Sequence, residues 1–229
     1  MQASALISSY RAGEFLRNKI INIMRSTIDM QIIIVECNSG CDVNSISDLI
    51  GHHNIKVKIF DKRISIWRAI NEAIKLSDFE FVVQANTDDL VSENAYEKQI
   101  NALKSGADIV YFDYYITDGY FGDWGNAKNN HYTYYETPDN GYSEGCGLGM
   151  FPMWRKSLHD EVGYFDDKLE ICGDSLFWHN LRENSKKFKR IPEKLGAYAQ
   201  RSGHNLESNI AYVAKDKVRL EALRSNPKR

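Results

Sequence analysis

Apolar and polar positions alternate in regular blocks through the first part of the chain. Short, almost wholly apolar runs predict buried strands, and between them apolar residues recur at the spacing of one helix face. This order of strand and helix, repeated three times before a fourth strand, predicts a parallel sheet with helices on its faces. Strands are expected at residues 3–8, 30–37, 55–60 and 81–83, and helices at 14–24, 42–50 and 66–76.

Polar side chains follow each of these four strands. Ser8 and Tyr10 follow the first strand, Glu36 the second, Asp61 the third and Asp88 the fourth. The carboxyl ends of parallel strands meet at one edge of a sheet, and ligands of open α/β sheets collect at that edge. The pattern therefore predicts a binding site built from these strand ends.

Two adjacent carboxylates, Asp88 and Asp89, end the fourth strand. Like charges side by side repel each other, and a bound divalent cation would remove that repulsion. Mg²⁺ prefers one or two carboxylates together with the oxygen atoms of a substrate phosphate. The alternative is that both residues form a turn and cap the helix expected at 93–105. The pair alone leaves both interpretations open.

The pattern is less regular in the second half of the chain. Residues 116–147, rich in Gly, Asn and Tyr, predict a long loop. Its aromatic residues suit either a platform for a sugar acceptor or a hairpin with cross-strand tyrosine pairs, and both interpretations stay open. Strands are expected at 108–115, 148–154, 188–191 and 195–200, and helices at 157–162, 175–183 and 206–223.

The composition indicates one globular α/β domain. The 229 residues are 43% hydrophobic and 26% charged, which is ordinary for a domain with a full core. A net charge of -2 offers no basic field for nucleic acid. The four cysteines are scattered, so we expect free thiols in a reducing compartment and no zinc or disulfide framework.

The sequence predicts a cytoplasmic protein. No apolar run approaches the ~18 residues of a membrane span, and the N-terminus lacks the basic region and apolar core of a signal peptide. Lys215, Lys217, Arg219 and Arg224 make the last expected helix basic. Such a face is typical of a solvated helix, and it also leaves open a peripheral position at the inner face of the membrane.

Five stretches, by their order and spacing, resemble the family-2 glycosyltransferases of the GT-A fold. They are ALISSYRAGEFLRNKIINIMRST, IIIVECNSG, AINEAIKLSDFEFVVQANTDDLV, MFPMWRKSLHDEVGYFDDKLEICGDSLFWHNL and AYAQRSGHN. The resemblance implies a single Rossmann-like α/β domain over residues 1–229, with a mostly parallel sheet flanked by helices. Residues 1–115 would form the nucleotide-sugar-binding half and residues 116–229 the acceptor-binding half.

The resemblance also implies an activity. A family-2 enzyme of this kind moves a sugar from a nucleoside-diphosphate sugar to a hydroxyl of a carbohydrate or lipid-linked acceptor, with inversion and with Mn²⁺ or Mg²⁺ as cofactor. Bacterial surface polysaccharide or glycoconjugate synthesis is the process that it suggests.

The donor-binding residues that the resemblance implies lie at the expected strand ends. Glu36-Cys37-Asn38-Ser39 stands where the family carries Asp-Asp-Gly-Ser, so the identity of the base stays open. Trp67 stands in place of the usual Gly before the third helix, where it either narrows the pocket or simply packs. The full donor-binding set is Ser8, Tyr10, Glu36, Asp61, Arg63 and Asp88.

The resemblance assigns the metal ligands and the general base as well. Asp89 is the expected direct metal ligand, and His204 matches a loop position that reaches the metal or the diphosphate. Asp174 is the expected base, although Gly173 replaces the acidic residue that usually precedes it. The alternatives are an N-cap role for Asp174 and no special role for His204.

Two other classes of function stay open. A nucleotidyltransferase would also use an α/β sheet, a metal and carboxylates, but the N-terminal region lacks a Gly-rich basic loop to hold a triphosphate. A non-catalytic relative that binds a sugar nucleotide or a partner would account for the departures at Glu36 and Trp67. Pyrophosphate release from a nucleoside triphosphate would favour the first, and a folded protein without turnover the second.

Overall fold

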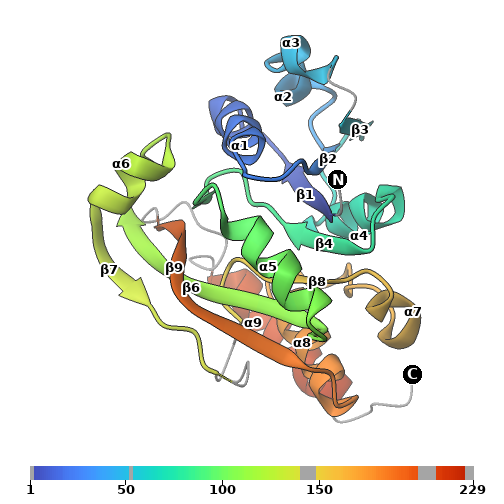
Figure 1. Cartoon of the computed structure of the whole chain (residues 1–229). Coiled ribbons are helices and arrows are strands. Elements are labelled where there is room, and N and C mark those ends of the chain that lie inside the picture. Colours follow the sequence, from blue (N-terminus) through green and yellow to red (C-terminus); the bar gives the residue numbers. More distant parts are fainter. Residues whose placement is uncertain (1–2, 52–53, 140–147, 201–209, 225–229) are drawn as a thin grey trace.

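The computed structural model describes residues 3–51, 54–139, 148–200 and 210–224, and their strands form one mixed nine-stranded sheet (Figure 1). The strand order is β3-β2-β1-β4-β8-β6-β9-β5, with β7 beside β6. The strands are β1 (Ala3–Ser9), β2 (Gln31–Glu36), β3 (Ile55–Ile59), β4 (Phe81–Gln84), β5 (Leu90–Val91), β6 (Ile109–Asp118), β7 (His131–Tyr135), β8 (Met153–Arg155) and β9 (Phe188–Gln200). The helices are α1 (Glu14–Met24), α2 (Cys41–Asn44), α3 (Ser47–Ile50), α4 (Ile66–Leu76), α5 (Ala95–Lys104), α6 (Trp124–Asn129), α7 (Leu158–Val162), α8 (Gly173–Glu183) and α9 (Ile210–Arg224).

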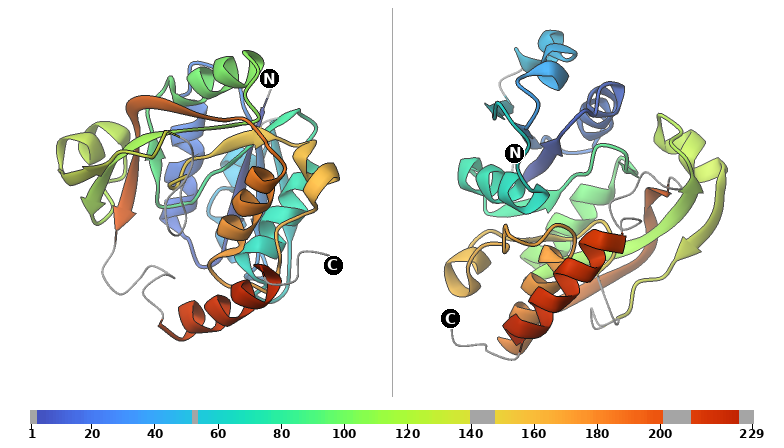
Figure 2. Two further views of the ribbon diagram at one scale, coloured as in Figure 1. Left: turned by 90° about the horizontal axis from the view of Figure 1, so that it is seen from below. Right: turned by 180° about the vertical axis from the view of Figure 1, so that it is seen from behind.

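The expected α/β architecture, a central sheet flanked by helices, is confirmed. Strands β3, β2, β1 and β4 run parallel, and the apolar sequences of β2, β1 and β4 reflect burial on both faces, whereas the edge strand β3 alternates. One core lies between the sheet and helices α1 and α5, and a second between the sheet and helices α4 and α8. Figure 1 shows α5 in front of the sheet and α8 and α9 behind it, and Figure 2 gives the view from behind.

The sheet is mixed but mostly parallel, as expected, since β3, β2, β1, β4, β6 and β9 run in one direction. Strand β8 runs antiparallel to both β4 and β6, and β5 and β7 run antiparallel to their neighbours. Strand β8 joins the parallel first half to β6 and β9, so one continuous sheet contains residues from both halves of the chain.

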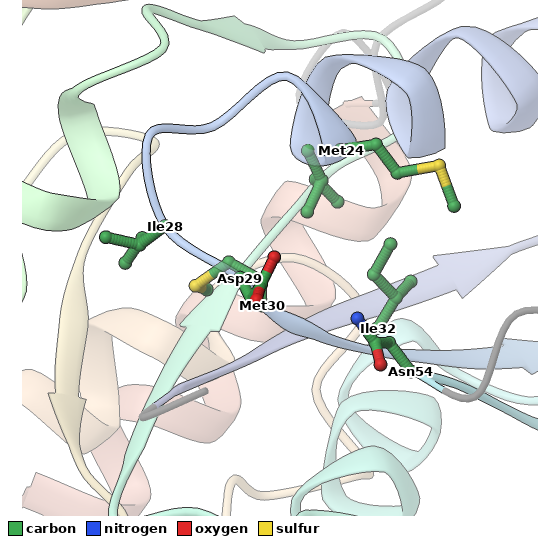
Figure 3. Close-up of a pocket in the computed structure, with 7 residues that line it drawn as sticks. Met24, Ile28, Asp29, Met30, Ile32 and Asn54 are labelled. Atoms are coloured by element: carbon green, nitrogen blue, oxygen red, sulfur yellow. The ribbon is translucent and has the colours of Figure 1, made fainter.

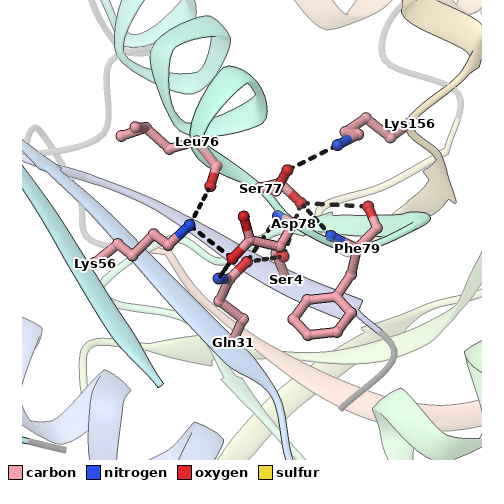
Figure 4. A network of polar contacts seen from close by, with 8 residues as sticks. All are labelled: Ser4, Gln31, Lys56, Leu76, Ser77, Asp78, Phe79 and Lys156. Carbon is pink, nitrogen blue, oxygen red and sulfur yellow. Dashed lines mark hydrogen bonds and ion pairs between the residues drawn. The ribbon is translucent and has the colours of Figure 1, made fainter. Parts of the chain in front are cut away.

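The amino-terminal edge of the parallel strands is closed by a polar network (Figure 4). The Gln31 side chain accepts from the Ser4 hydroxyl at 2.7 Å and donates to Asp78 at 2.6 Å. Asp78 also pairs with Lys56 at 2.6 Å. These contacts tie β1, β2 and β3 to the loop after α4, so they fix the strands at the edge opposite the polar strand ends.

Residues 188–200 form one strand, where the sequence predicted two. Phe112 of β6 pairs with Ile191, but Asp113 pairs with Lys194, so the register shifts across Pro192. Proline has no N–H for the ladder and is tolerated at such an irregularity. The strand therefore passes the proline as a bulge and continues.

Residues 116–135 form regular elements in place of the expected loop. Strand β6 continues to Asp118, α6 begins after the Asp123 side-chain cap, and β7 returns beside β6. The rings of Tyr114 and Tyr135 lie 5.3 Å apart across this hairpin. The hairpin interpretation is therefore confirmed for residues 116–135, and residues 140–147 lie outside the described residues.

Other differences concern the ends of elements. The strand expected at 148–154 is limited to the three residues of β8, and the first part of the helix expected at 206–223 lies outside the described residues. Among the helices that the structure describes, none is long and apolar enough to cross a bilayer.

A small cavity of about 160 Å³ lies at the start of β2 (Figure 3). Its lining is mainly aliphatic, with Met24, Ile28, Met30 and Ile32 among the contributors. The cavity is at the amino-terminal edge of the sheet, away from the strand ends where the sequence places a site.

Candidate active site

The carboxylate turn, residues 86–89, lies between β4 and β5 at the carboxyl edge of the sheet. Asp89 is only 1% exposed. Its carboxylate accepts from the Asn86 side-chain amide at 2.9 Å and from the Ala199 backbone N–H at 3.3 Å. Burial raises the pKa of the Asp89 carboxyl above its ordinary value. The Asp89 side chain thus joins the turn to the end of β9.

Two buried side chains of helix α1 hydrogen-bond to the backbone of this turn and of β5, which follows it. Lys19 donates to the Asp89 carbonyl at 2.9 Å. Asn22 donates to the Val91 carbonyl at 2.9 Å and accepts from the Val91 N–H at 3.0 Å. Burial lowers the pKa of Lys19, and the charges of Asp89 and Asp88 oppose that shift. Helix α1 therefore positions the carboxylate turn and places a buried lysine beside its two carboxylates.

Asp88 and Asp89 differ in their access to a ligand. Asp88 is partly exposed, whereas the Asp89 carboxylate is enclosed and already accepts two hydrogen bonds. Each Asp89 oxygen accepts only one hydrogen bond and keeps a second lone pair, so it is the burial of Asp89 that favours the more accessible Asp88 for a direct metal bond. This differs from the sequence-based assignment, which made Asp89 the direct metal ligand and Asp88 a donor-binding residue.

The carboxylate turn fits a divalent cation whose coordination shell the donor diphosphate would complete. No group of three His, Cys, Asp or Glu side chains forms a ready cage among the described residues. Mg²⁺ commonly takes only one or two protein carboxylates and completes its shell with phosphate oxygens and water. A partly exposed Asp88 beside the buried Asp89 matches that donor set.

Ser8, Tyr10 and Arg63, three of the residues expected to bind the donor, lie toward the α4 face of the sheet. Ser8 and Cys37 share this face, because Leu6 and Val35, two residues earlier in each strand, belong to the core against α4. The guanidinium of Arg63 lies 5.8 Å from the centre of the Tyr10 ring. Ser8, Tyr10 and Arg63 therefore line one rim.

Asp61 is exposed in the loop after β3 at this rim. Its backbone carbonyl accepts from the Ser39 hydroxyl at 2.9 Å. This bond links the loop after β3 to the loop after β2.

Glu36 is not brought together with Ser8 and Tyr10. It lies on the opposite, α1 face with Ile34, and it is 0% exposed. Burial raises the pKa of Glu36, and the backbone N–H groups of Asn38 and Gly40 partly offset that shift. Its carboxylate is enclosed under the turn at residues 38–40, whereas Cys37 lies on the α4 face and is itself buried in the core there.

Asp42 is a further polar residue that supports this edge. Its carboxylate accepts from the Ser9 hydroxyl at 2.7 Å and from the N–H groups of Ala12 and Gly13 at 3.0 and 3.1 Å. The sequence predicted Asp42 as the cap of its own helix, but it lies inside α2 and instead holds the loop that enters α1.

Asp174 lies in the first turn of α8 and is partly exposed. Its carboxylate accepts from the Ser175 N–H at 2.7 Å. The preceding Gly173 packs against the ring of Trp67 in α4, which begins at the same edge of the sheet. His204 lies outside the described residues.

The sequence model described as glycosyl transferase family 2 matches residues 4–163. The chain belongs to glycosyl transferase family 2. The matched region includes the carboxylate turn and the donor rim and ends before α8. No curated protein matches the chain.

Solved structures support the same fold for this family-2 chain. S. aureus TarS 1-349 in complex with UDP-GlcNAc has a TM-score of 0.71 and 14% identity, over 91% of this chain and 61% of that chain. Mannosyltransferase PcManGT from Pyrobaculum calidifontis in complex with GDP-Man and Mn²⁺ has a TM-score of 0.71 and 12% identity, over 97% and 64%. At these identities the likeness shows the fold alone, and the chain spans less than two thirds of either relative.

Two departures of this family-2 chain from the family pattern meet in space. A Cβ atom at Gly173 would lie 2.7 Å from three ring atoms of Trp67, which is 3% exposed. The large side chain in α4 therefore requires the small residue at the start of α8. Trp67 packs, and its packing explains why residue 173 carries no acidic side chain.

We expect Gly173→Ala to lower the free energy of unfolding by about 1–3 kcal/mol, the usual cost of overpacking a core. In a Trp67→Leu background the same change should cost much less, because the two sites are in contact. Urea unfolding of the single and double variants measures this coupling. Gly51→Ala is the matched control, since a Cβ at Gly51 meets no atom within 4 Å. Equal costs in both backgrounds would contradict the pairing.

Sequence reasoning missed Lys19, Asn22 and Cys37. Lys19 and Asn22 lie on the buried face of α1 with Leu16 and Ile23, and a lysine at that helical spacing was a readable signal. Cys37 could have been found from strand periodicity, since alternate residues of a strand share a face.

Proposed function

We propose that the chain transfers a glycosyl group from a nucleoside-diphosphate sugar to an acceptor hydroxyl, with inversion at the anomeric carbon. The observation that carries this proposal is the carboxylate turn of a family-2 fold, held by α1 and β9 with Asp88 left accessible. The structural relatives were solved with UDP-GlcNAc or with GDP-Man and Mn²⁺, which supports a donor of this class.

Donor recognition falls to the rim on the α4 face. Tyr10 is 41% exposed and offers a ring face, and Arg63 beside it offers a cation for the donor's phosphates. Ser8 and Asp61 supply a hydroxyl and a carboxylate at the same edge. Cys37 lies beneath this rim, where burial raises the pKa of its thiol. Glu36 supports the turn beneath this rim.

Asp88 would hold Mn²⁺ or Mg²⁺ against the donor diphosphate, with Asp89 fixing the turn. His204 is retained as a proposed contact to the metal or the diphosphate. When bound, such an ion acts as a Lewis acid that stabilises charge on the leaving phosphate.

Asp174 is the proposed general base. It accepts the proton of the acceptor hydroxyl while the acceptor oxygen attacks the anomeric carbon opposite the leaving phosphate. Residues 116–229 would form the acceptor side, with a carbohydrate or lipid-linked acceptor. Bacterial surface polysaccharide or glycoconjugate synthesis, in the cytoplasm or at the inner face of the membrane, is the proposed setting.

A thermal-shift panel of nucleoside diphosphates and their sugar conjugates, with and without Mn²⁺, tests this function. A ligand at about 100 times its Kd stabilises the native state by about 2.7 kcal/mol, which raises Tm by roughly 5–10 °C for a chain of this size. We expect such a shift with one base and only with Mn²⁺. The absence of a shift with every base would contradict donor binding and favour a non-catalytic relative.

A further inference from the structure

Helix α9 contacts the chain just before the proposed base through one fully buried carboxylate. Asp216 is 0% exposed. It accepts from the backbone N–H groups of Glu170 at 3.0 Å, Ile171 at 2.6 Å and Cys172 at 2.9 Å. Three consecutive N–H groups therefore converge on a side chain that is more than forty residues away in sequence.

This arrangement fixes the entry to α8. Cys172 is the N-cap residue of α8 and makes no side-chain cap hydrogen bond. Hydrogen bonds from N–H groups to a carboxylate are charge-assisted, so they are shorter and stronger than those to neutral acceptors. The backbone that leads into Gly173 and Asp174 is thus oriented from outside α8, by Asp216.

The loop before α8 is held on its other side by α4. Asn71 donates to the Phe165 carbonyl at 2.8 Å and accepts from the Phe165 N–H at 3.1 Å. The Ser65 hydroxyl donates to the Asp167 carbonyl at 2.7 Å. Helix α4 therefore fixes residues 165–167, whereas α9 fixes residues 170–172, directly before the base.

A second contact of α9 is more peripheral. Arg219 donates to the Asp166 carboxylate at 2.6 and 2.9 Å, six residues or more from the start of α8. Arg219 is 35% exposed, so solvent screens this pair. It ties α9 to the same loop without touching residues 170–172.

We propose that Asp216 is a positioning residue for Asp174. It holds the turn at 170–172 so that the Asp174 carboxylate meets the acceptor hydroxyl at the edge of the sheet. This inference rests on the proposed function of Asp174 as general base. It gives α9, which lies beyond the matched family region, a role in the rate of transfer.

Asp216→Asn tests the inference in the full chain. The amide leaves one acceptor oxygen in place of two and removes the charge, so the turn loses its fixed position. Small displacements of a reacting group cost up to about 100-fold in rate, and we expect kcat for transfer to fall about 10- to 100-fold. The donor Kd should change much less than kcat, because within the described part of the chain Asp216 reaches the donor rim only through the 3.9 Å pair of Glu170 with Arg63. Arg219→Gln, the matched control on the same helix, should keep the wild-type kcat.

A double variant separates positioning from a general loss of stability. If Asp216 acts through Asp174, adding Asp216→Asn to Asp174→Asn should lower the rate no further. A merely structural role would lower the rate in both backgrounds, and that result would overturn the inference. If Asp216→Asn fails to fold, Asp216→Ser, which leaves a hydroxyl acceptor and room for water, takes its place in the same comparison.

The outcomes also distinguish this inference from the proposed function. A wild-type rate of transfer by Asp174→Asn would exclude Asp174 as the general base, and it would overturn the inference about Asp216 as well. An inactive Asp174→Asn together with a fully active Asp216→Asn would overturn the inference alone.

Discussion

Asp174→Asn is expected to lower the rate of glycosyl transfer by about 10²–10⁴-fold, the contribution of a general base in many enzymes. Asparagine has the same shape but accepts no proton at neutral pH. The Ser175 N–H donates to the Asp174 carboxylate at 2.7 Å, and it can still donate to the amide oxygen of the asparagine. The start of α8 should therefore keep its structure while transfer is lost.

Initial rates with donor and acceptor, together with a donor titration of the same variant, measure this effect. The donor Kd should equal the wild-type value, because Asp174 is assigned to the acceptor. Asp167→Asn is a matched control, since Asp167 is an exposed carboxylate in the loop before α8. A transfer rate near wild type in Asp174→Asn would exclude it as the base and leave a structural role at the start of α8.

Asp88→Asn and Asp89→Asn are expected to have different effects. Asp88→Asn should weaken the Mn²⁺-dependent part of donor binding by at least about 100-fold, since loss of residues that merely support a metal ligand already costs 10- to 100-fold. Asp89→Asn should mainly lower the free energy of unfolding, by about 1–3 kcal/mol. It disturbs buried hydrogen bonds to Asn86 and Ala199.

Donor titrations at several Mn²⁺ concentrations, paired with urea unfolding, separate the two effects. The two variants serve as controls for each other, because they make the same Asp→Asn change one residue apart. If Asp89→Asn abolishes Mn²⁺ dependence at unchanged stability while Asp88→Asn keeps it, the first assignment of Asp89 as the direct ligand is restored.

The location of the site could be read from the sequence, since polar residues at Ser8, Asp61 and Asp88 follow apolar strands that the fold aligns at one edge. Which carboxylate faces a ligand could not be read in that way. Asp88 and Asp89 are neighbours in sequence, and their exposure depends on Ala199, 110 residues after Asp89. Long-range contacts of this kind leave no local pattern.

Residues whose faces follow a regular period were readable in principle. Glu36 and Cys37 lie on opposite faces of the sheet, so the α1-facing position of Glu36 follows from counting along β2. The partners of Trp67 and Asp216 were not readable, because each meets the start of α8 from a helix that lies far away in sequence. The bulge that carries β9 past Pro192 also depends on its pairing with β6.

The long pairing of β6 with β9 has a consequence for how the chain acquires its activity. Ile109 pairs with Phe188, so this part of the sheet closes only after nearly eighty intervening residues have been made. Pairings between distant residues form slowly, because loop closure costs entropy before any contact compensates for it. The Ala199 N–H reaches Asp89 only after β9 has docked. A nascent chain could thus complete its parallel strands early, yet its carboxylate turn would take its final form only at the last stage of folding.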